Sequence, residues 1–307
     1  MTLHAGALDR SRSGSVEWLT FSLILACYGA WGLVTVLLYP VAPVLAVCVT
    51  GVLIAFHSSL THEALHGHPF RSKALNEALM FFPLNLCVPY NRFRDQHLAH
   101  HHDQILTDPY DDPESNYLDP AVWEGLEGWK RRLLVLNNTL VGRIVIGPVL
   151  GQVRFMQDDW RAARAGDRAV WRAWGLHLPG VVIVLGWVIW MTQMPVWAYV
   201  VAAYIGLALL KIRTFLEHQA HERARCRTVI IEDRGPLALL FLNNNLHVVH
   251  HMHPNVPWYR LPRLYAQNKA RYLARNDGYV YRSYAEIFQG YFLRPKDPVP
   301  HPLWRRD

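Results

Sequence analysis

Four long apolar runs constrain the fold of this chain more than any other feature of its sequence. None contains Lys, Arg, Asp or Glu, and they cover residues 18–39, 41–60, 175–192 and 195–210. A helix needs about 20 mostly apolar residues to cross a bilayer. The first two runs have that length, and helix can continue from the last two into polar sequence. Because the two runs of each pair are separated by a very short break, we predict an integral membrane, all-α protein with four transmembrane helices in two hairpins.

The positive charges predict the orientation of these helices. All 31 Lys and Arg residues lie outside the runs and their short breaks. Loops rich in Lys and Arg mark the cytoplasmic side of a membrane, whereas buried helices of a soluble bundle would have charges around both ends. We therefore expect one membrane domain, residues 1–307, in a bacterial inner membrane. Its termini and a helical cap formed by residues 61–174 and 211–307 are expected to be cytoplasmic.

The composition narrows the classes of partner. A formal net charge of +7 would suit nucleic acid, an anionic membrane surface or an acidic protein. Twelve Trp and fourteen Tyr favour the membrane, because these side chains are enriched at the boundary between water and lipid. We expect a membrane location and no nucleic-acid partner.

Most of the 17 histidines fall in three clusters, which contain the sequences HEALH (62–66), HLAHH (97–101) and HVVHH (247–251). In the first cluster two histidines are four residues apart. In the other two, the spacing is i, i+3 and i+4. Residues at these spacings share one face of a helix. The face-sharing histidines are His62 and His66, then His97, His100 and His101, then His247, His250 and His251.

These faces predict a metal centre. Imidazole is a good ligand for iron, zinc, copper and nickel. One helical face cannot enclose an ion, but two such faces and a further pair can hold two ions between them. His218 and His221 follow the last apolar run; either could complete the coordination of one ion, and His218 is preferred. Five other histidines lie off the shared faces or alone in apolar sequence and are not expected to be ligands, namely His57, His68, His102, His177 and His253.

The three clusters together resemble the histidine boxes of the integral membrane fatty acid desaturase family. The superfamily also includes alkane and fatty acid hydroxylases and carotenoid ketolases. The resemblance covers almost the whole chain, since the order of the boxes and their distances from the apolar runs also fit. It implies two iron ions, O₂ as co-substrate and nine nitrogen ligands: His62, His66, His97, His100, His101, His218, His247, His250 and His251.

Several polar residues could support these ligands. Metal-bound histidines usually donate their other N–H group to an acceptor, which makes the nearby carboxylates candidates. Capping of the loop around Pro109 and Pro113 explains these acidic residues equally well. Asn243 lies four residues before His247 and could support a bound water. The candidates for this outer layer are His221, Asn243, Asp95, Asp108, Asp111 and Asp112.

The resemblance implies an O₂-dependent oxidoreductase, and a fatty acyl desaturase acting on a lipid chain is the leading interpretation. A hydroxylase or ketolase of a fatty acid, alkane or carotenoid would use the same ligands, so the boxes do not determine the product. A metal transporter would have ionisable residues in its spans, and the runs have almost none. The sequence has no dinucleotide, haem or ferredoxin motif, so we expect a separate ferredoxin or rubredoxin with its reductase. Basic residues 130–132 and 260–275 could bind that donor or anionic lipid.

Overall fold

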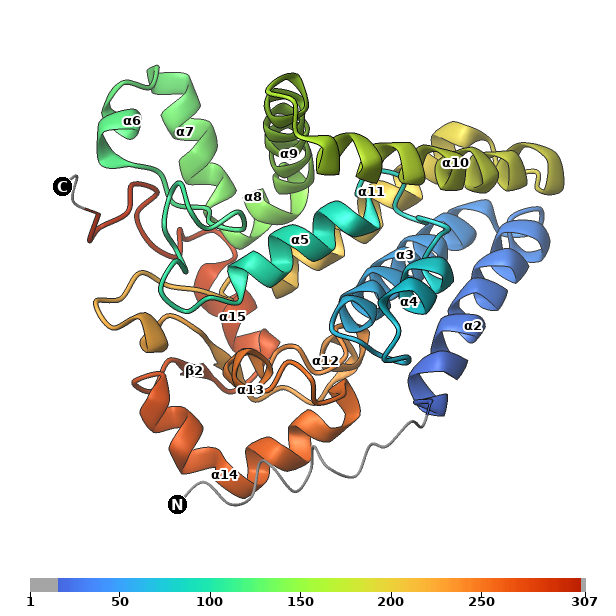
Figure 1. Ribbon diagram of the computed structural model, residues 1–307. Helices are drawn as coiled ribbons and strands as arrows, with labels where there is room; N and C mark the ends of the chain where they lie inside the picture. Colours follow the sequence, from blue (N-terminus) through green and yellow to red (C-terminus); the bar gives the residue numbers. More distant parts are fainter. Residues whose placement is uncertain (1–15, 305–307) are drawn as a thin grey trace.

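The computed structural model describes residues 16–304, and this part of the chain is mostly helical (Figure 1). Four helices are long and apolar enough to cross a membrane, which confirms the predicted all-α fold with four candidate spans, while their arrangement in two hairpins stays a prediction. The first is α2 (Trp18–Leu33), which continues as the π-helix η1 (Val34–Leu38). The others are α3 (Pro43–Leu65), α10 (Arg168–Met191) and α11 (Val196–Arg213).

The helices differ from the predicted runs mainly at their polar ends. α3 continues to Leu65 and α11 to Arg213, whereas α10 begins already at Arg168. The Asp167 carboxylate accepts hydrogen bonds from two backbone N–H groups of the first turn of α10, which satisfies donors that have no partner within the helix. The extension of α3 matters for function, because it places the first histidine cluster on a spanning helix.

The closest contact among the spans is between α3 and α11. At their crossing, a Cβ atom added to Gly51 would lie 2.6 Å from the Ile205 Cγ2 atom. A Cβ atom added to Gly206 would lie 2.7 Å from the Ile54 Cγ2 atom. Two glycines therefore allow the two backbones to approach as small residues do in membrane helix pairs. The other spans join the same bundle, since the Trp187 indole of α10 donates a hydrogen bond to Thr35 of η1.

Shorter elements form the rest of the described chain. Between α3 and α10 lie α4 (Lys73–Leu79), α5 (Tyr90–His100), α6 (Pro120–Glu124), α7 (Gly128–Asn137), α8 (Leu140–Val145) and α9 (Gly147–Arg164). After α11 come η2 (Ala224–Cys226), β1 (Ile230–Ile231), α12 (Pro236–Leu240), α13 (His247–Met252), η3 (Trp258–Arg260), α14 (Leu261–Arg275), β2 (Val280–Tyr281) and α15 (Tyr284–Tyr291).

These shorter elements bring distant parts of the sequence together. β1 pairs in parallel with β2, with Ile230 opposite Val280. In Figure 1, α5 crosses the middle of the molecule, and α14 lies on the outer edge beside α13, against which it packs. The last turn of α3, α5 and α13 consequently surround one interior region. The side of the membrane on which they lie stays a prediction.

Candidate metal centre

The three histidine clusters lie on helices, as their spacing predicts. His62 belongs to the last turn of α3, and His66 caps the C-terminal end of that helix. α5 contains His97 and His100, with His101 as its C-cap. α13 contains the third cluster, whose histidines are His247, His250 and His251.

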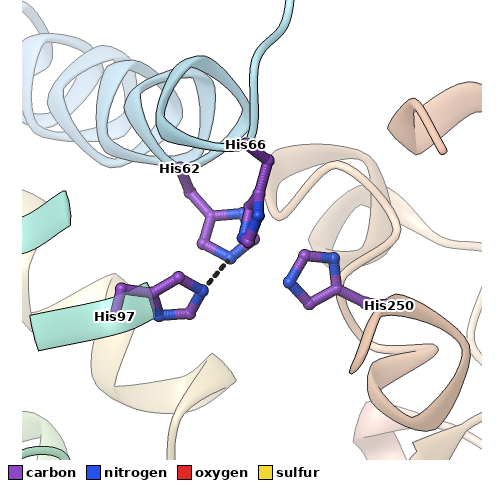
Figure 2. Close-up of side chains that lie close together, drawn as sticks. All are labelled: His62, His66, His97 and His250. Carbon is purple, nitrogen blue, oxygen red and sulfur yellow. Dashed lines mark hydrogen bonds between the residues drawn. The ribbon is translucent and has the colours of Figure 1, made fainter. Parts of the chain in front are cut away.

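The first group of histidines gathers four rings from three helices. Candidate ligand atoms of His62, His66, His97 and His250 all lie within 4.8 Å of one another. Figure 2 shows these rings turned toward one another, with the dashed line between His62 and His97 marking an Nε2–Nε2 distance of 2.9 Å. Helices far apart in the sequence therefore present nitrogen atoms to one point.

A second group forms beside the first. Candidate ligand atoms of His100, His218, His247 and His251 also lie within 4.8 Å of one another. The Nε2 atom of His218 is 2.8 Å from that of His100 and 3.1 Å from that of His247. His221 lies outside the group. Its Nδ1 atom accepts a hydrogen bond from the Arg223 backbone, and its Nε2 atom is 3.5 Å from a carboxylate oxygen of Asp277.

His101 lies between the two groups. Its Nε2 atom is 3.0 Å from that of His97 and 3.2 Å from that of His250, both in the first group. Its ring stacks on that of His251 in the second group, with centroids 4.3 Å apart. His101 can therefore add a fifth nitrogen to the first group, which brings all nine expected histidines into one cluster.

Several ring nitrogen atoms in the cluster have a lone pair that is available to bind a cation. The Nδ1–H group of His97 donates to Glu114 (2.8 Å), and that of His100 donates to Asp112 (2.7 Å). In a neutral imidazole that donates through Nδ1, the Nε2 atom has a lone pair. The Nε2 atom of His97, whose pKa is lowered mainly by burial, faces those of His62 and His101 at about hydrogen-bond distance. In addition, the buried Nε2 atom of His66 has no hydrogen-bond partner among the described residues. The donor set therefore fits bound metal ions.

The electrostatics of most of these rings favours the neutral, ligating form. Burial lowers the pKa of His218, His247, His250 and His251 well below the usual value, and neighbouring histidines add to this effect. The same causes lower the pKa of His101 to about 3. A neutral imidazole offers its lone pair without first losing a proton.

His100 is the exception. Burial opposes its charged form, but the nearby carboxylates of Glu114 and Asp112 outweigh that effect and raise the pKa of His100 to about 9. Burial likewise opposes ionisation of Glu114, yet the neighbouring His100 and His97 lower the pKa of its carboxyl group. In the metal-free protein a proton on His100 therefore balances part of the buried negative charge.

Asp112 is the one predicted carboxylate that reaches a ligand ring, and the structure corrects the other candidates for the outer layer. Asp95 forms an exposed ion pair with Arg94. Asp108 accepts hydrogen bonds from two backbone N–H groups of its own loop, and Asn243 donates to the Trp258 carbonyl group. Asp111 is exposed on the same loop. Loop capping, the competing explanation for these acidic residues, describes Asp108.

Four supporting residues were missed from the sequence. Glu114 accepts from His97, and the Asn244 side chain accepts from the Nδ1–H group of His247 (3.1 Å). Glu217 has a carboxylate oxygen 3.9 Å from His247 Nδ1, and Glu63 has one at the same distance from His62 Nδ1. Helical spacing could have revealed Asn244, because it lies three residues before His247, but Asn243 at four residues fits the same spacing and in fact donates to Trp258. The spacing of Glu114 from Asp112 could have suggested a second acceptor.

A cavity of about 320 Å³ lies beside the second group. Its lining includes His218 and the carboxylates of Asp112, Glu114 and Glu217. Residues of α3, α5, α9 and α11 complete its walls, and these walls combine apolar and polar side chains. The candidate metal centre is therefore next to a space large enough for part of a small molecule.

A helical bundle with four candidate membrane spans and a histidine cluster that could hold metal ions is the class of protein that this geometry defines. Comparison with known families gives a match to the family described as fatty acid desaturase over residues 35–284, a range that contains all nine histidines. The chain belongs to the fatty acid desaturase family. No match is found among curated proteins.

Proposed function

We propose that this protein is an O₂-dependent, non-haem di-iron oxidoreductase that introduces a double bond into a lipid-chain substrate. The observation that carries the proposal is the convergence of histidine nitrogen atoms into two adjacent groups. Membership of the desaturase family supports the same class of reaction. Purely nitrogen ligands at this density suit a divalent transition metal better than magnesium or calcium.

The two groups, with His101 added to the first, would assign the nine histidines to two iron ions. His62, His66, His97, His101 and His250 would hold one, and His100, His218, His247 and His251 the other. Two bound irons that activate O₂ would supply the oxidant needed to remove hydrogen from an unactivated methylene group. The chain itself supplies position and exclusion of water. Asp112 and Glu114 fix the orientation of two ligand rings, and the burial of most of the cluster keeps bulk water away.

The substrate is proposed to enter from the membrane, because the cavity beside the second group is bounded by the ends of two spanning helices. A hydroxylase or ketolase acting on a fatty acid, alkane or carotenoid would use the same ligand set. The two possibilities differ in the product, since desaturation removes two hydrogen atoms and hydroxylation adds one oxygen atom.

The deciding test is product analysis under air and under nitrogen. Purified, iron-supplied protein is given a ferredoxin or rubredoxin, its reductase and a deuterium-labelled acyl substrate. We expect loss of two hydrogen isotopes from the chain, under air only. Equal turnover under nitrogen would contradict O₂ dependence, and exclusively oxygenated product would identify a hydroxylase or ketolase instead.

Two alanine variants connect that activity to the metal centre. Replacing His250 with Ala should abolish turnover and lower the iron content, because His250 belongs to the first group. Replacing His102 with Ala is the matched control, since this side chain is exposed and belongs to neither group. Iron retained at the wild-type level in the His250 variant would argue against the assigned ligand set.

We further propose that an acidic ferredoxin or rubredoxin delivers electrons at α14, on the cytoplasmic side of a bacterial inner membrane. α14 packs against α13, which contains the third histidine cluster. Arg263 and Arg271 on α14 are exposed and form no ion pair with any residue in the described range 16–304. In the other basic segment, Lys130 already pairs with Glu127. Charge complementarity therefore favours α14, with anionic lipid as the competing partner.

A further inference from the structure

Lys211 lies inside the protein without a direct ion pair, although Glu114 and Glu217 act on its charge from beyond ion-pair distance. It stands in the last turn of α11 and is partly buried. Across residues 16–304, no carboxylate oxygen lies within the 4.0 Å ion-pair distance of its ammonium group, and no hydrogen bond to that group is formed. A buried charge without a partner is costly, so such groups are rare unless they serve a ligand.

The Lys211 ammonium group lines the cavity beside the second histidine group. It points across to α9, where a Cβ atom added to Gly151 would lie 3.1 Å from Nζ. Lysines at the ends of spanning helices often extend toward the water at the membrane surface. Lys211 instead packs against the bare backbone of another helix and faces an internal space.

The other cations around this cavity already have partners. Arg213 Nε is 3.2 Å from a carboxylate oxygen of Glu217. Lys296 donates a hydrogen bond to the His218 carbonyl group, and Arg154 donates to that of Ser115. Among the described cations that line the cavity, Lys211 is the one whose charged group has no direct ion pair or hydrogen bond.

The wall around Lys211 has an amphipathic pattern. Leu207, Leu210 and Lys211 are at i, i+3 and i+4 on α11 and all line the cavity. Apolar surface therefore leads along the helix to a positive charge. Gln96, on the α5 wall, has a side-chain amide that forms no hydrogen bond within residues 16–304. A ligand with an apolar chain and a polar end would match this wall, which is apolar along α11 and polar at Lys211 and Gln96.

We propose that Lys211 binds the carboxylate group of an amphipathic substrate, with the Gln96 amide as a second donor. The proposal rests on the proposed function and specifies its substrate class as a free carboxylic acid rather than a hydrocarbon. One ammonium group matches the single charge of a carboxylate. The cavity reaches His218, so carbons near the acid end of the chain lie toward the second histidine group.

The test measures binding, which needs neither electrons nor O₂. Iron-loaded protein in lipid nanodiscs is titrated calorimetrically with octanoate and with octan-1-ol, and empty nanodiscs provide the blank. We expect wild-type protein to bind octanoate at least tenfold more tightly than octanol. Replacing Lys211 with Met should remove this preference and leave octanol binding unchanged. Replacing Lys73, an exposed lysine on α4, with Met should leave the preference intact.

Two further variants separate charge recognition from a folding defect. Lys211→Arg should keep most of the preference for octanoate. Gly151→Ala should weaken octanoate binding several-fold, because the added methyl group crowds the ammonium group without removing its charge. An unchanged octanoate-to-octanol ratio in the Lys211→Met protein would overturn the proposal. So would tighter, Lys211-dependent binding of octyl phosphate, because the anionic group would then be a phosphate.

The proposed role of Lys211 and the proposed reaction can be refuted independently of each other. If wild-type turnover depends on O₂ but octanoate is not preferred, the anchoring role of Lys211 is wrong and the enzyme class stands. If the preference depends on Lys211 but no O₂-dependent turnover occurs, the cavity binds acids and the proposed reaction is wrong.

Discussion

Replacing Asp112 with Asn tests whether the carboxylates around the histidines tune the metal centre or only hold a loop. One Asp112 oxygen accepts from the His100 Nδ1–H group (2.7 Å) and from the Glu114 backbone (2.9 Å). The other accepts from the Thr107 backbone (2.9 Å). Asparagine has nearly the same shape but only one oxygen. In the variant, the asparagine NH₂ group must therefore face either the N–H groups of His100 and Glu114 or the N–H group of Thr107, and it cannot accept from them.

We expect the Asp112→Asn substitution to lower both the metal affinity and the folding stability of the protein. Loss of an outer partner of a ligating histidine typically costs 10–100-fold in metal affinity, or about 1.4–2.8 kcal/mol. If the asparagine oxygen stays with His100, the Thr107 N–H group is left without an acceptor, which costs about 1–3 kcal/mol of folding free energy. The first effect appears in metal binding, and the second appears in the stability of the metal-free protein.

The assay is a competitive titration of iron or cobalt, together with thermal unfolding of the metal-free protein. Asp111→Asn is the matched control, because Asp111 is the preceding residue and its side chain is exposed. We expect the Asp112 variant to lose 10–100-fold in affinity at one of two sites and the control to lose less than twofold. Wild-type affinity at both sites in the Asp112 variant would refute the tuning role, whatever its stability.

Three further predictions test the bundle, the protonation of the ligands and the donor surface. Gly51→Ala should destabilise the protein by about 1–3 kcal/mol, because its methyl group meets α11, whereas Gly29→Ala meets no atom within 4 Å and should be neutral in thermal unfolding. Because the pKa of His100 is raised from 6.5 to about 9, its proton competes with metal, and affinity should rise by up to about tenfold per pH unit toward pH 9 in metal titrations. The same shift stabilises the metal-free fold fully below pH 6.5, and this contribution should fade as the pH rises through 9. Arg263→Glu should raise the KM for an acidic donor and weaken its salt dependence, and an unchanged KM would argue against docking at α14.

The sequence predicted the parts of the centre that follow helical periodicity. Each histidine cluster lies on one helical face, and each face was visible from the spacing alone. The four candidate spans could also be predicted from the sequence, because long runs of apolar residues are typical of membrane-spanning helices. Spacing alone hardly distinguishes His218 from His221, since both follow α11 at similar distances. The structure separates them because His221 turns outward to Asp277.

The acceptors for the histidine rings lie in irregular segments of the chain, and helical spacing alone did not identify them. Asn244 follows Leu242 and Asn243, which both have positive φ values (50° and 56°). Asn243 and Asn244 both fit a helical spacing to His247, and the irregular backbone decides between them, because Asn244 reaches the His247 ring whereas Asn243 donates to Trp258. Glu114 likewise belongs to a loop whose path depends on contacts formed by Asp112. Sequence spacing identifies ligands on helices, whereas their acceptors on loops require the folded chain.

The close contact of α3 and α11 connects the membrane bundle to the metal centre. His62 lies on α3, eleven residues after Gly51, and His218 follows the end of α11, twelve residues after Gly206. The two glycines set the separation of these helices, and with it the positions of His62 and of the α11 end from which the chain leads to His218. Lys211 lies on the same helix between Gly206 and His218, and its position is fixed by the same contact. If the proposed function holds, a lipid chain that occupies the cavity would meet both Lys211 and His218, because both line it.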